Sequence, residues 1–550
     1  MGIVELLSKY DSVLAEHVTL VQNAQESGKR LQVHCLSNRI QNEFIEICGA
    51  RVKMSIIDEI KSAKYFSIAV DGTPDCSHKE QLSFIIRYVR IDLENYQFSI
   101  EERFLGFLEF SNKTGKEIAQ AILDFLESVT LNFEEDCSGQ AYDNAANMSV
   151  KYNGVQAILK KINENCIFSS CANHTLNLVG TDCAEACNEA KIFFGIIQRY
   201  YNVFSSSPQR WEILQKHLPV TVHKMSATRW SARIDCVRPF SRHLNSLKNA
   251  AIEVSGLTNL TAEVKSDLKS IIKYLDTFEC ILMSAVWIKI LTMIHEVNLI
   301  IESRDATLDV EMMNISLLQG DIKNLREKWD DILKEACYVS NNLSVSDSFE
   351  INSRLRSSYS SQEEAEDNFR VNVFYNIIDY VIDGLSRRFS AAKNICELFD
   401  FLWQFKQLNE NELSQKTIHF QLKYSKHVSN DIESEMLLLK RIFDVNFKID
   451  KVAPKNIFEQ ILKLRLSNVF PNVLIALRIF LSLPATVASN ERSFSVLKRI
   501  KSFYRSKMSQ ERLNGLAMLN INSDKAKLLD YSSVINEFAQ KKARKSFIMS

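Results

Sequence analysis

The chain has 550 residues, of which 46% are hydrophobic, so it can bury a large core and is long enough for two or more domains. Lys plus Arg and Asp plus Glu number 67 each, so no global basic excess indicates nucleic acid, and polyanion binding would need local patches. The 12 cysteines form no CxxC pair, which favours a reducing compartment and predicts free thiols.

No segment is expected to cross a membrane. The most apolar stretch, Cys280 to Ile294, is cut by Lys289 after nine uncharged residues, far short of the roughly 20 that a bilayer requires. The N-terminus, Met1 to Glu5, lacks the charged and apolar regions of a secretory signal. We therefore expect an intracellular chain.

The first elements are a helical lead-in followed by strands. Residues 1–64 carry apolar side chains every three or four positions, which predicts helices. From Tyr65 the period changes, and Tyr65–Val70 is a short apolar run that ends at Asp71. Two β-rich runs, Gln81–Arg90 and Tyr96–Leu108, follow at hairpin-like spacing, so the simplest prediction is three consecutive antiparallel strands.

A mixed order of helices and strands comes next. We predict a helix over Lys116–Val129, a strand ending at Asp143, a helix over Val155–Ile162 and a strand over Cys166–Ser170. Strand, strand, strand, helix, strand, helix, strand is the order of a ribonuclease-H-like α/β fold. In such a fold Asp71 would end the first strand and Asp143 the fourth, and these two strands are neighbours in the sheet.

The rest of the chain reads mainly as helices. Long amphipathic patterns dominate from about residue 235 to 455, which predicts a large all-helical insertion into the α/β core. Helices with Ser-led starts follow. The predicted domains are a helical lead-in (1–64), the first part of the core (65–234), the insertion (235–455), a C-terminal region completing the core (456–525) and a basic tail (526–550).

Three carboxylates suit a metal-dependent nucleic-acid enzyme. Phosphoryl transfer by two metal ions needs several oxygen ligands around Mg²⁺ or Mn²⁺, and Asp71, Asp143 and Glu491 would supply them if they converge. Glu491 precedes Phe494 and Leu497 at helical spacing, so it would share the face that packs on the core. The alternative is that the aspartates are turn or cap residues and Glu491 an exposed first-turn acid, and for any one alone this alternative is favoured.

A Cys-x-x-His segment follows the last predicted strand. Cys171 and His174 could be joined with Cys183 and Cys187 into a four-ligand zinc site, but the spacing is not that of a standard finger, and we do not expect zinc. We expect instead that the thiols are small core residues. His174 would then contact substrate or make a structural hydrogen bond near the carboxylates.

Two other segments combine cations with aromatic rings. Arg229 and Trp230 could bind a phosphate and stack an unpaired base, and a buried tryptophan anchoring the helical insertion is an equally good reading. A basic cluster after Glu491 could track a DNA backbone, although a solvated helix face explains it almost as well. Its residues are Lys498, Arg499, Lys501, Arg505 and Lys507, interleaved with Phe503 and Tyr504. The run Lys541–Lys545 resembles a nuclear-import signal.

These motifs together resemble the hAT superfamily of DNA transposases and the host proteins derived from it, in the branch of zinc finger MYM-type protein 1. The C-terminal stretch Leu483–Ser495 is similar to the family signature Ser-x-Glu-Arg-x-Phe-Ser, and it is followed by Arg512 and Leu513. The other matching stretches, in the family's order, are Tyr65–Asp71, Gly139–Met148, Cys171–His174 and Arg229–Trp230.

The resemblance implies a ribonuclease-H-like core with a helical insertion, and it assigns Asp71, Asp143 and Glu491 to the family's acidic triad. It assigns Cys171 and His174 to the Cys-x-x-His motif, and Arg229 and Trp230 to the pair near the cleaved DNA end, where the ring stabilises a flipped base. The C-terminal region is a dimerisation domain in the family, which implies at least a homodimer. We assign the dimerisation contacts to Phe494, Leu497, Leu513 and Leu516.

The leading hypothesis is a nuclear hAT-type transposase, or a domesticated copy, that cleaves and joins DNA with Mg²⁺ or Mn²⁺ and takes no small-molecule substrate. The family usually begins with a zinc-binding DNA-recognition finger, and no Cys/His array precedes Leu6 here. The rival is a catalytically silent, dimerising regulator of chromatin or transcription. A helical scaffold unrelated to DNA would require all the motif matches to be accidental.

Overall fold

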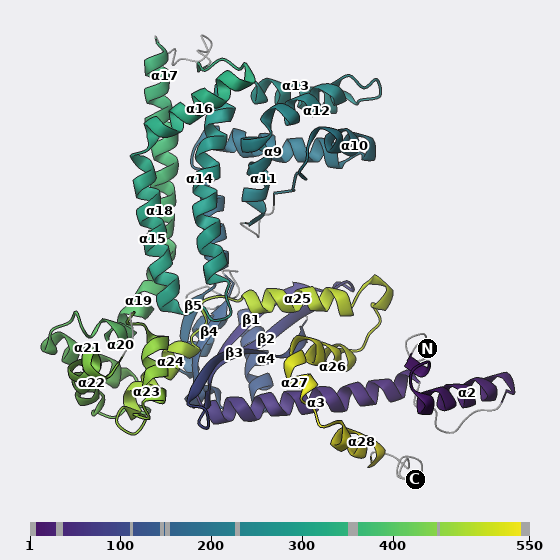
Figure 1. The fold of residues 1–550 in the computed structure, drawn as a ribbon, viewed down its shortest axis with the longest axis vertical. Helices are drawn as coiled ribbons and strands as arrows, with labels where there is room; N and C mark the ends of the chain where they lie inside the picture. The colour runs from purple at the N-terminus through teal and green to yellow at the C-terminus, as the bar shows by residue number, and fades with distance from the viewer. Residues whose placement is uncertain are drawn as a thin grey trace.

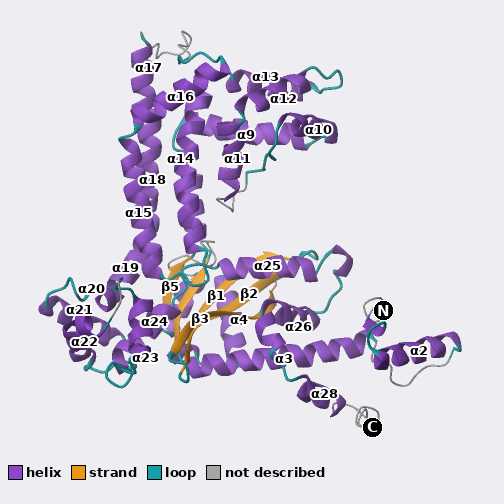
Figure 2. Cartoon of the chain, viewed as in Figure 1, coloured by secondary structure: helices purple, strands orange, loops and turns teal. Residues whose placement is uncertain are grey.

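The protein is built around one small sheet from which helices extend in several directions, as the computed structural model shows (Figures 1 and 2). The structure describes residues 7–28, 37–110, 114–143, 148, 154–225, 231–349, 361–447 and 451–540. Its buried apolar side chains form three large clusters. We call the corresponding parts the sheet region (38–170 and 488–540), the tower (172–389) and the lobe (390–485).

The sheet has five strands in the order β3-β2-β1-β4-β5. They are β1 (Phe66–Pro74), β2 (Glu80–Asp92), β3 (Gln97–Phe110), β4 (Cys137–Tyr142) and β5 (Ile167–Ser170). The first three pair antiparallel, whereas β4 runs parallel to both β1 and β5. The first five residues of β1 are all buried, as expected for a central strand covered on both faces.

Helices from both ends of the chain cover the sheet. The helix α3 (Asn38–Ala63) buries Ile56 and Ile60 against it, and it crosses α26 (Gln510–Ile521). The crossing is close because a glycine from each helix meets there: a Cβ on Gly515 would lie 2.8 Å from Ile45 Cγ2. The remaining elements are α2 (Ser12–Glu26), α4 (Gly115–Ser128), α5 (Phe133–Asp136), α7 (Val155–Ile162), α25 (Ala488–Ile500), η2 (Phe503–Arg505), α27 (Ser523–Lys527) and α28 (Tyr531–Gln540).

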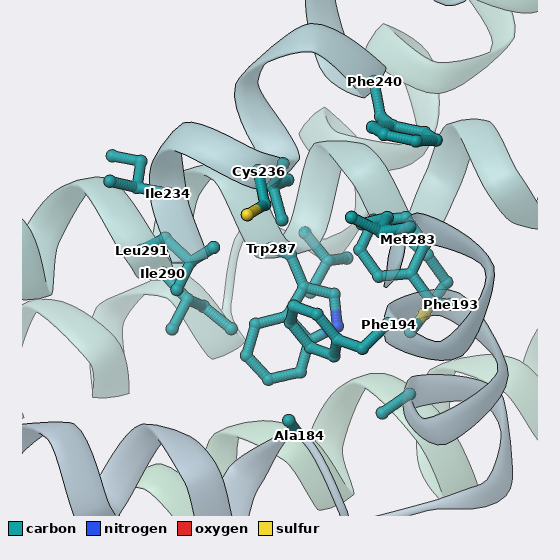
Figure 3. Packing of buried hydrophobic residues seen from close by; sticks show 14 of the residues in the cluster. Ala184, Phe193, Phe194, Ile234, Cys236, Phe240, Met283, Trp287, Ile290 and Leu291 are labelled. Atoms are coloured by element: carbon teal, nitrogen blue, oxygen red, sulfur yellow. The ribbon is translucent and has the colours of Figure 1, made fainter. Parts of the chain in front are cut away.

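The tower stands on one end of the sheet region (Figure 1). Its helices are α8 (Ala172–Cys183), α9 (Asn188–Ser205), α10 (Pro208–His217), α11 (Ser231–Arg242), α12 (Leu244–Ser255), α13 (Ala262–Leu275), α14 (Phe278–Ile301), α15 (Leu308–Arg326), α16 (Trp329–Leu343), α17 (Gln362–Asn368), the π-helix η1 (Phe369–Tyr375) and α18 (Asn376–Arg388). Fully buried Trp287 lies at the centre of the packing, against the ring of Phe194 (Figure 3).

One tower helix, α14, is long and apolar enough to cross a membrane by length and composition, among the residues that the structure describes. Most of its apolar side chains are buried in the tower core instead. It contacts α8, α11, α15 and α16. This packing explains the apolar composition of α14 as that of a core helix.

The lobe packs beside the sheet region. Its helices are α19 (Ser390–Phe399), α20 (Phe401–Gln404), α21 (Glu410–Lys423), α22 (Ile432–Asn446), α23 (Pro454–Lys463) and α24 (Pro471–Ser482). The expected α/β core with a large helical part is therefore present. The helical part differs from the expected insertion in two ways, because it begins at Ala172 rather than at residue 235 and has two separate cores.

Candidate functional site

Two neighbouring strands bring Asp71 and Asp143 to the same edge of the sheet. Strands β1 and β4 are parallel, with Ala69 opposite Ala141. Each aspartate comes two residues after its alanine, so both side chains leave the strands on the same face. Asp143 directly follows β4, whereas Asp71 lies inside β1, which continues to Pro74 alongside β2 only. Both aspartates are partly buried.

The first turn of α25 carries Glu491 and is fixed to the strands by its neighbours. The side chain of buried Asn490 donates hydrogen bonds to Ala69 O at 3.0 Å and to Ser83 O at 2.8 Å. Ser493 Oγ lies 2.7 Å from Ser83 Oγ. Because these contacts lie on both sides of Glu491 in the sequence, they hold its backbone against β1 and β2. Glu491 itself is partly buried.

The Cys-x-x-His segment links the end of β4 to the approach to α25. Cys171 N donates to Tyr142 O at 3.2 Å, and Ala172 N donates to Ala485 O at 3.2 Å. The buried Cys171 thiol accepts a hydrogen bond from Val487 N at 3.4 Å. This cysteine therefore joins the segment before Asp143 to the segment before Glu491.

Electrostatic interactions show that the three acids share one environment. Burial and the nearby carboxylates of Asp143 and Glu491 together raise the pKa of Asp71 to about 7, against the opposing effect of a hydrogen bond from Gly72 N. That N–H lies 2.8 Å from Asp71 Oδ1. Like charges near one another resist simultaneous ionisation. The structure thus brings together the three residues that the sequence separates widely.

His174 lies near Asp143 and near the cation of Arg388 from α18. Burial lowers the pKa of His174, Asp143 opposes this effect, and the positive charge of Arg388 adds to it. Arg388 Nη2 donates to Asp182 Oδ2 at 2.6 Å. Sequence reasoning missed Arg388, which lies far along the chain from every motif.

In the described parts of the chain, no three His, Cys, Asp or Glu side chains lie close enough together to hold a metal ion as they stand. Three carboxylates nevertheless offer the oxygen ligands that hard divalent cations prefer. The cysteines are less suited to bind a metal ion than the carboxylates, because burial raises the thiol pKa of Cys171 and Cys183 to about 12. A zinc site would need their thiolates.

The basic cluster after Glu491 divides into exposed and buried members. Lys498, Arg499 and Arg505 are exposed, and Phe503 and Tyr504 beside them are 82% and 95% exposed. Lys507 is exposed as well.

The prediction that Lys501 contacts DNA is wrong for this fold. Lys501 is only 4% exposed, and its Nζ lies 2.6 Å from Asp75 Oδ2. Gln81 Nε2 also donates to Asp75 Oδ2, at 3.1 Å. Lys501 instead ties the end of α25 to the β1–β2 hairpin.

The predicted dimerisation residues also need correction. Phe494, Leu497 and Leu513 are buried in the sheet-region core of their own chain, where Phe494 stacks near Phe107 with ring centroids 6.4 Å apart. They cannot at the same time face a second subunit. Leu516 is partly buried. The apolar stripe on these helices was correctly recognised as a packing face, but its partner is the sheet.

Two of the predicted functional segments lie outside the described residues. They are Arg229–Trp230 and the basic run Lys541–Lys545. Their predicted contacts with DNA and with the import machinery stay predictions.

Two family models match the parts of the chain that carry the three acids. Residues 3–154 match the family described as DUF4371, the ZMYM1/FAM200 RNase-like domain. Residues 451–524 match the hAT family C-terminal dimerisation region. The first match contains Asp71 and Asp143, and the second contains Glu491.

Two curated proteins are similar over most of the chain. The human 52 kDa repressor of the inhibitor of the protein kinase is 22% identical over 88% of this chain and 65% of its own length. The mouse protein of the same name is 24% identical over 88% of this chain and 65% of its own. The chain thus spans about two thirds of these relatives, and the resemblance to the hAT superfamily is confirmed.

Proposed function

Starting from a chain of hAT descent, we propose a transposase-like protein whose sheet region is a ribonuclease-H-like core that cleaves and transfers DNA strands in the nucleus. Asp71, Asp143 and Glu491 are the proposed catalytic acids. The observation that carries this proposal is the shared environment of the three acids, in which both Asp143 and Glu491 raise the pKa of Asp71. If Asp71 and Asp143 were only turn residues and Glu491 only an acid in the first turn of a helix, nothing would require the three carboxylates to lie near one another.

The three carboxylates would hold Mg²⁺ or Mn²⁺, which when bound supplies charge neutralisation and water activation for phosphoryl transfer. Repulsion among the acids favours a divalent cation between them. Water would attack one DNA strand, and the hydroxyl released by that cleavage would attack the other. His174, uncharged at neutral pH because its pKa is lowered, can donate an imidazole N–H to DNA beside Asp143.

The proposed DNA path leaves the acids along the exposed side of α25. Arg492, Ser495 and Arg499 are exposed at helical spacing, with Lys498 beside them, and the path ends at Phe503 and Tyr504. No acidic residue occurs between Arg492 and Gln510. Exposed rings next to cations can stack unpaired bases while the cations bind phosphates.

The test of catalysis is nicking and strand joining by the full chain with Mn²⁺ on plasmid DNA. Glu491→Gln and Asp71→Asn should each lower the rate at least about 100-fold with unchanged folding. The matched control is Glu511→Gln, because Glu511 is also an acid in the first turn of a helix, α26, and is exposed. Equal rates in Glu491→Gln and wild type would overturn the proposal.

A second candidate function is a catalytically silent regulator that keeps the fold for dimerisation and partner binding. The observation that favours it is the word repressor in the names of both curated relatives. Under this alternative, Asp71→Asn and Glu491→Gln would leave binding to DNA or chromatin intact, and the wild-type chain would cut nothing.

The exposed rings of Phe503 and Tyr504 could also lie in the subunit interface of the homodimer that the matched C-terminal region suggests. A symmetric contact would place Lys498, Arg499 and Arg505 against their own copies, and this repulsion favours DNA as the occupant. Phe503→Ser with Tyr504→Ser should weaken binding to single-stranded DNA about tenfold or more and leave the oligomeric state in light scattering unchanged. Dissociation of a dimer instead would assign the rings to the subunit interface.

A further inference from the structure

A buried arginine on β2 joins the base of the tower to the sheet. The Arg87 side chain is 2% exposed and lies at the position opposite Glu102 on β3. Its Nη1 donates to Glu102 Oε1 at 2.8 Å and to Arg304 O at 3.1 Å. Its Nη2 donates to Ala306 O at 2.7 Å. Residues 304 and 306 lie in the turn between α14 and α15, on which the tower stands.

The same guanidinium reaches the helix that leads to Glu491. Arg87 Nε donates to Leu481 O at 3.2 Å, at the end of α24. Every nitrogen of the guanidinium is therefore used, by a strand, a turn and a helix end that lie far apart in the sequence. A planar guanidinium can make such a set of contacts at once, whereas an ammonium cannot.

The carboxylate of Glu102 continues this chain of contacts to α25. Its second oxygen accepts a hydrogen bond from Ser489 Oγ, two residues before Glu491. Arg492 Nη2 donates to the same hydroxyl at 3.0 Å, and Arg492 Nη1 lies 3.5 Å from Glu302 O at the end of α14. The first turn of α25 is thus connected to the tower base on both sides of Glu491.

The burial of the Arg87 and Glu102 side chains makes the members of this network depend on one another. A buried charge is stable only when its partners are in place, and removing one partner leaves an uncompensated charge. A shift of the 302–307 turn away from the sheet would therefore loosen Arg87, then Glu102, and then the first turn of α25. The hydrogen bond from Arg492 to Glu302 O also joins this turn of α25 to the tower, and Arg87 supplies the buried route.

We infer that Arg87 is a positioning residue that transmits the position of the tower base to Glu491 through Glu102 and Ser489. The inference rests on the proposed function, because the position of Glu491 affects DNA cleavage only if Glu491 is one of the catalytic acids.

The experiment is amide hydrogen exchange on the full chain, followed in peptides that cover 302–307 and 488–494. Arg87→Lys should speed exchange in both peptides, by about tenfold in 488–494, although the hydrogen bonds of Arg87 go to Glu102, Arg304, Ala306 and Leu481, outside that peptide. Ser489→Ala removes the hydroxyl that joins Glu102 and Arg492 but no buried charge, and it should speed exchange in 488–494 alone. The double variant should exchange in 488–494 no faster than Ser489→Ala, since both changes break one chain of contacts.

The matched control is Arg103→Lys. Arg103 is also a strand arginine paired with carboxylates, those of Glu101 and Asp524, but it contacts neither the tower turn nor Ser489. It should leave both peptides unchanged. Unchanged exchange in 488–494 in Arg87→Lys, or additive effects in the double variant, would overturn the inference.

Mn²⁺ titration separates this inference from the proposed function. Arg87→Lys and Ser489→Ala should weaken Mn²⁺ binding about three- to tenfold, and Arg103→Lys should leave it unchanged. A wild-type chain that binds no Mn²⁺ would overturn the proposed function, while the exchange result still decides the coupling. Binding of Mn²⁺ by wild type and equally by all variants would overturn the inference alone.

Discussion

The tower and the sheet region are stabilised by different kinds of contact. The tower is one long succession of helices around a single apolar cluster, with Trp287 fully buried at its centre. The sheet region combines an apolar core with buried polar contacts between the two ends of the chain. Asn490 and Ala69 are 421 positions apart, and Lys501 and Asp75 are 426 apart.

This difference shows where directional contacts are needed. Apolar packing is non-directional and tolerates small shifts, which suits a structural tower. Buried hydrogen bonds and ion pairs fix one geometry, because each unpaired group costs free energy. They surround Glu491, the only one of the three acids that comes from the C-terminal part of the chain. The proposed site thus lies where buried polar contacts join the two ends of the chain.

The largest expected effect tests the buried ion pair of the sheet region. Lys501→Met leaves Asp75 as an uncompensated buried charge and should lower the free energy of unfolding by about 3–5 kcal/mol in urea denaturation. Lys498→Met, at an exposed position of the same helix, should change it by no more than about 0.5 kcal/mol. Adding Asp75→Asn to Lys501→Met should recover part of the loss. If Lys501→Met lowers the free energy of unfolding by less than about 1 kcal/mol, buried polar contacts do not stabilise the sheet region in the way that distinguishes it from the tower.

A substitution in the tower should destabilise the protein without reaching the acids. Trp287→Ala leaves a cavity in the apolar cluster and should cost about 3–4 kcal/mol, measured by urea denaturation. Mn²⁺ affinity in the absence of urea should stay within about twofold of wild type, because the partners of Trp287 belong to the tower. Loss of Mn²⁺ binding in a folded Trp287→Ala variant would mean that the two regions are not separable in this way.

The smallest effect follows from the raised pKa of Asp71. A carboxyl with a folded pKa of about 7 holds its proton more tightly than in the unfolded chain, so stability falls as pH rises from about 4 to 7 and then levels off. Asp71→Asn removes this penalty. Relative to wild type, the variant should gain about 2–3 kcal/mol between pH 5 and pH 8 in chelator, measured by denaturation.

The control for this pH dependence is Asp383→Asn, at an exposed position of α18. It should show no gain between the two pH values. A gain of the same size in both variants would mean that Asp71 has no special environment.

Local patterns were sufficient to predict the strands. The apolar run at Tyr65–Val70 became β1, and the β-rich runs after it became β2 and β3, because alternation and turn residues are properties of neighbouring positions. The convergence of Asp71 and Asp143 followed from the strand order. The helical part begins at Ala172 rather than at residue 235, since helices α8 to α10 follow β5 directly.

Side chains whose partners lie far away could not be assigned from the sequence. Lys501 has the same residue type and spacing as exposed Lys498, and only the hairpin bearing Asp75 distinguishes them. Phe494 and Leu513 are apolar residues that could pack against a second subunit or against the sheet. The sequence alone does not distinguish these two partners. The buried hydrogen bonds of Asn490 could have been predicted from the sequence. A polar residue beside Glu491 on a packing face requires a buried hydrogen-bond partner.

The most direct test of the central idea, that acids from both ends of the chain form one cation site, is Mn²⁺ binding by titration calorimetry at pH 8. Wild type should bind saturably, and Asp71→Asn, Asp143→Asn and Glu491→Gln should each weaken binding about tenfold or more, whereas Glu511→Gln should not. Undiminished binding in Glu491→Gln, with loss in the two aspartate variants, would contradict the account by leaving the C-terminal acid outside the site.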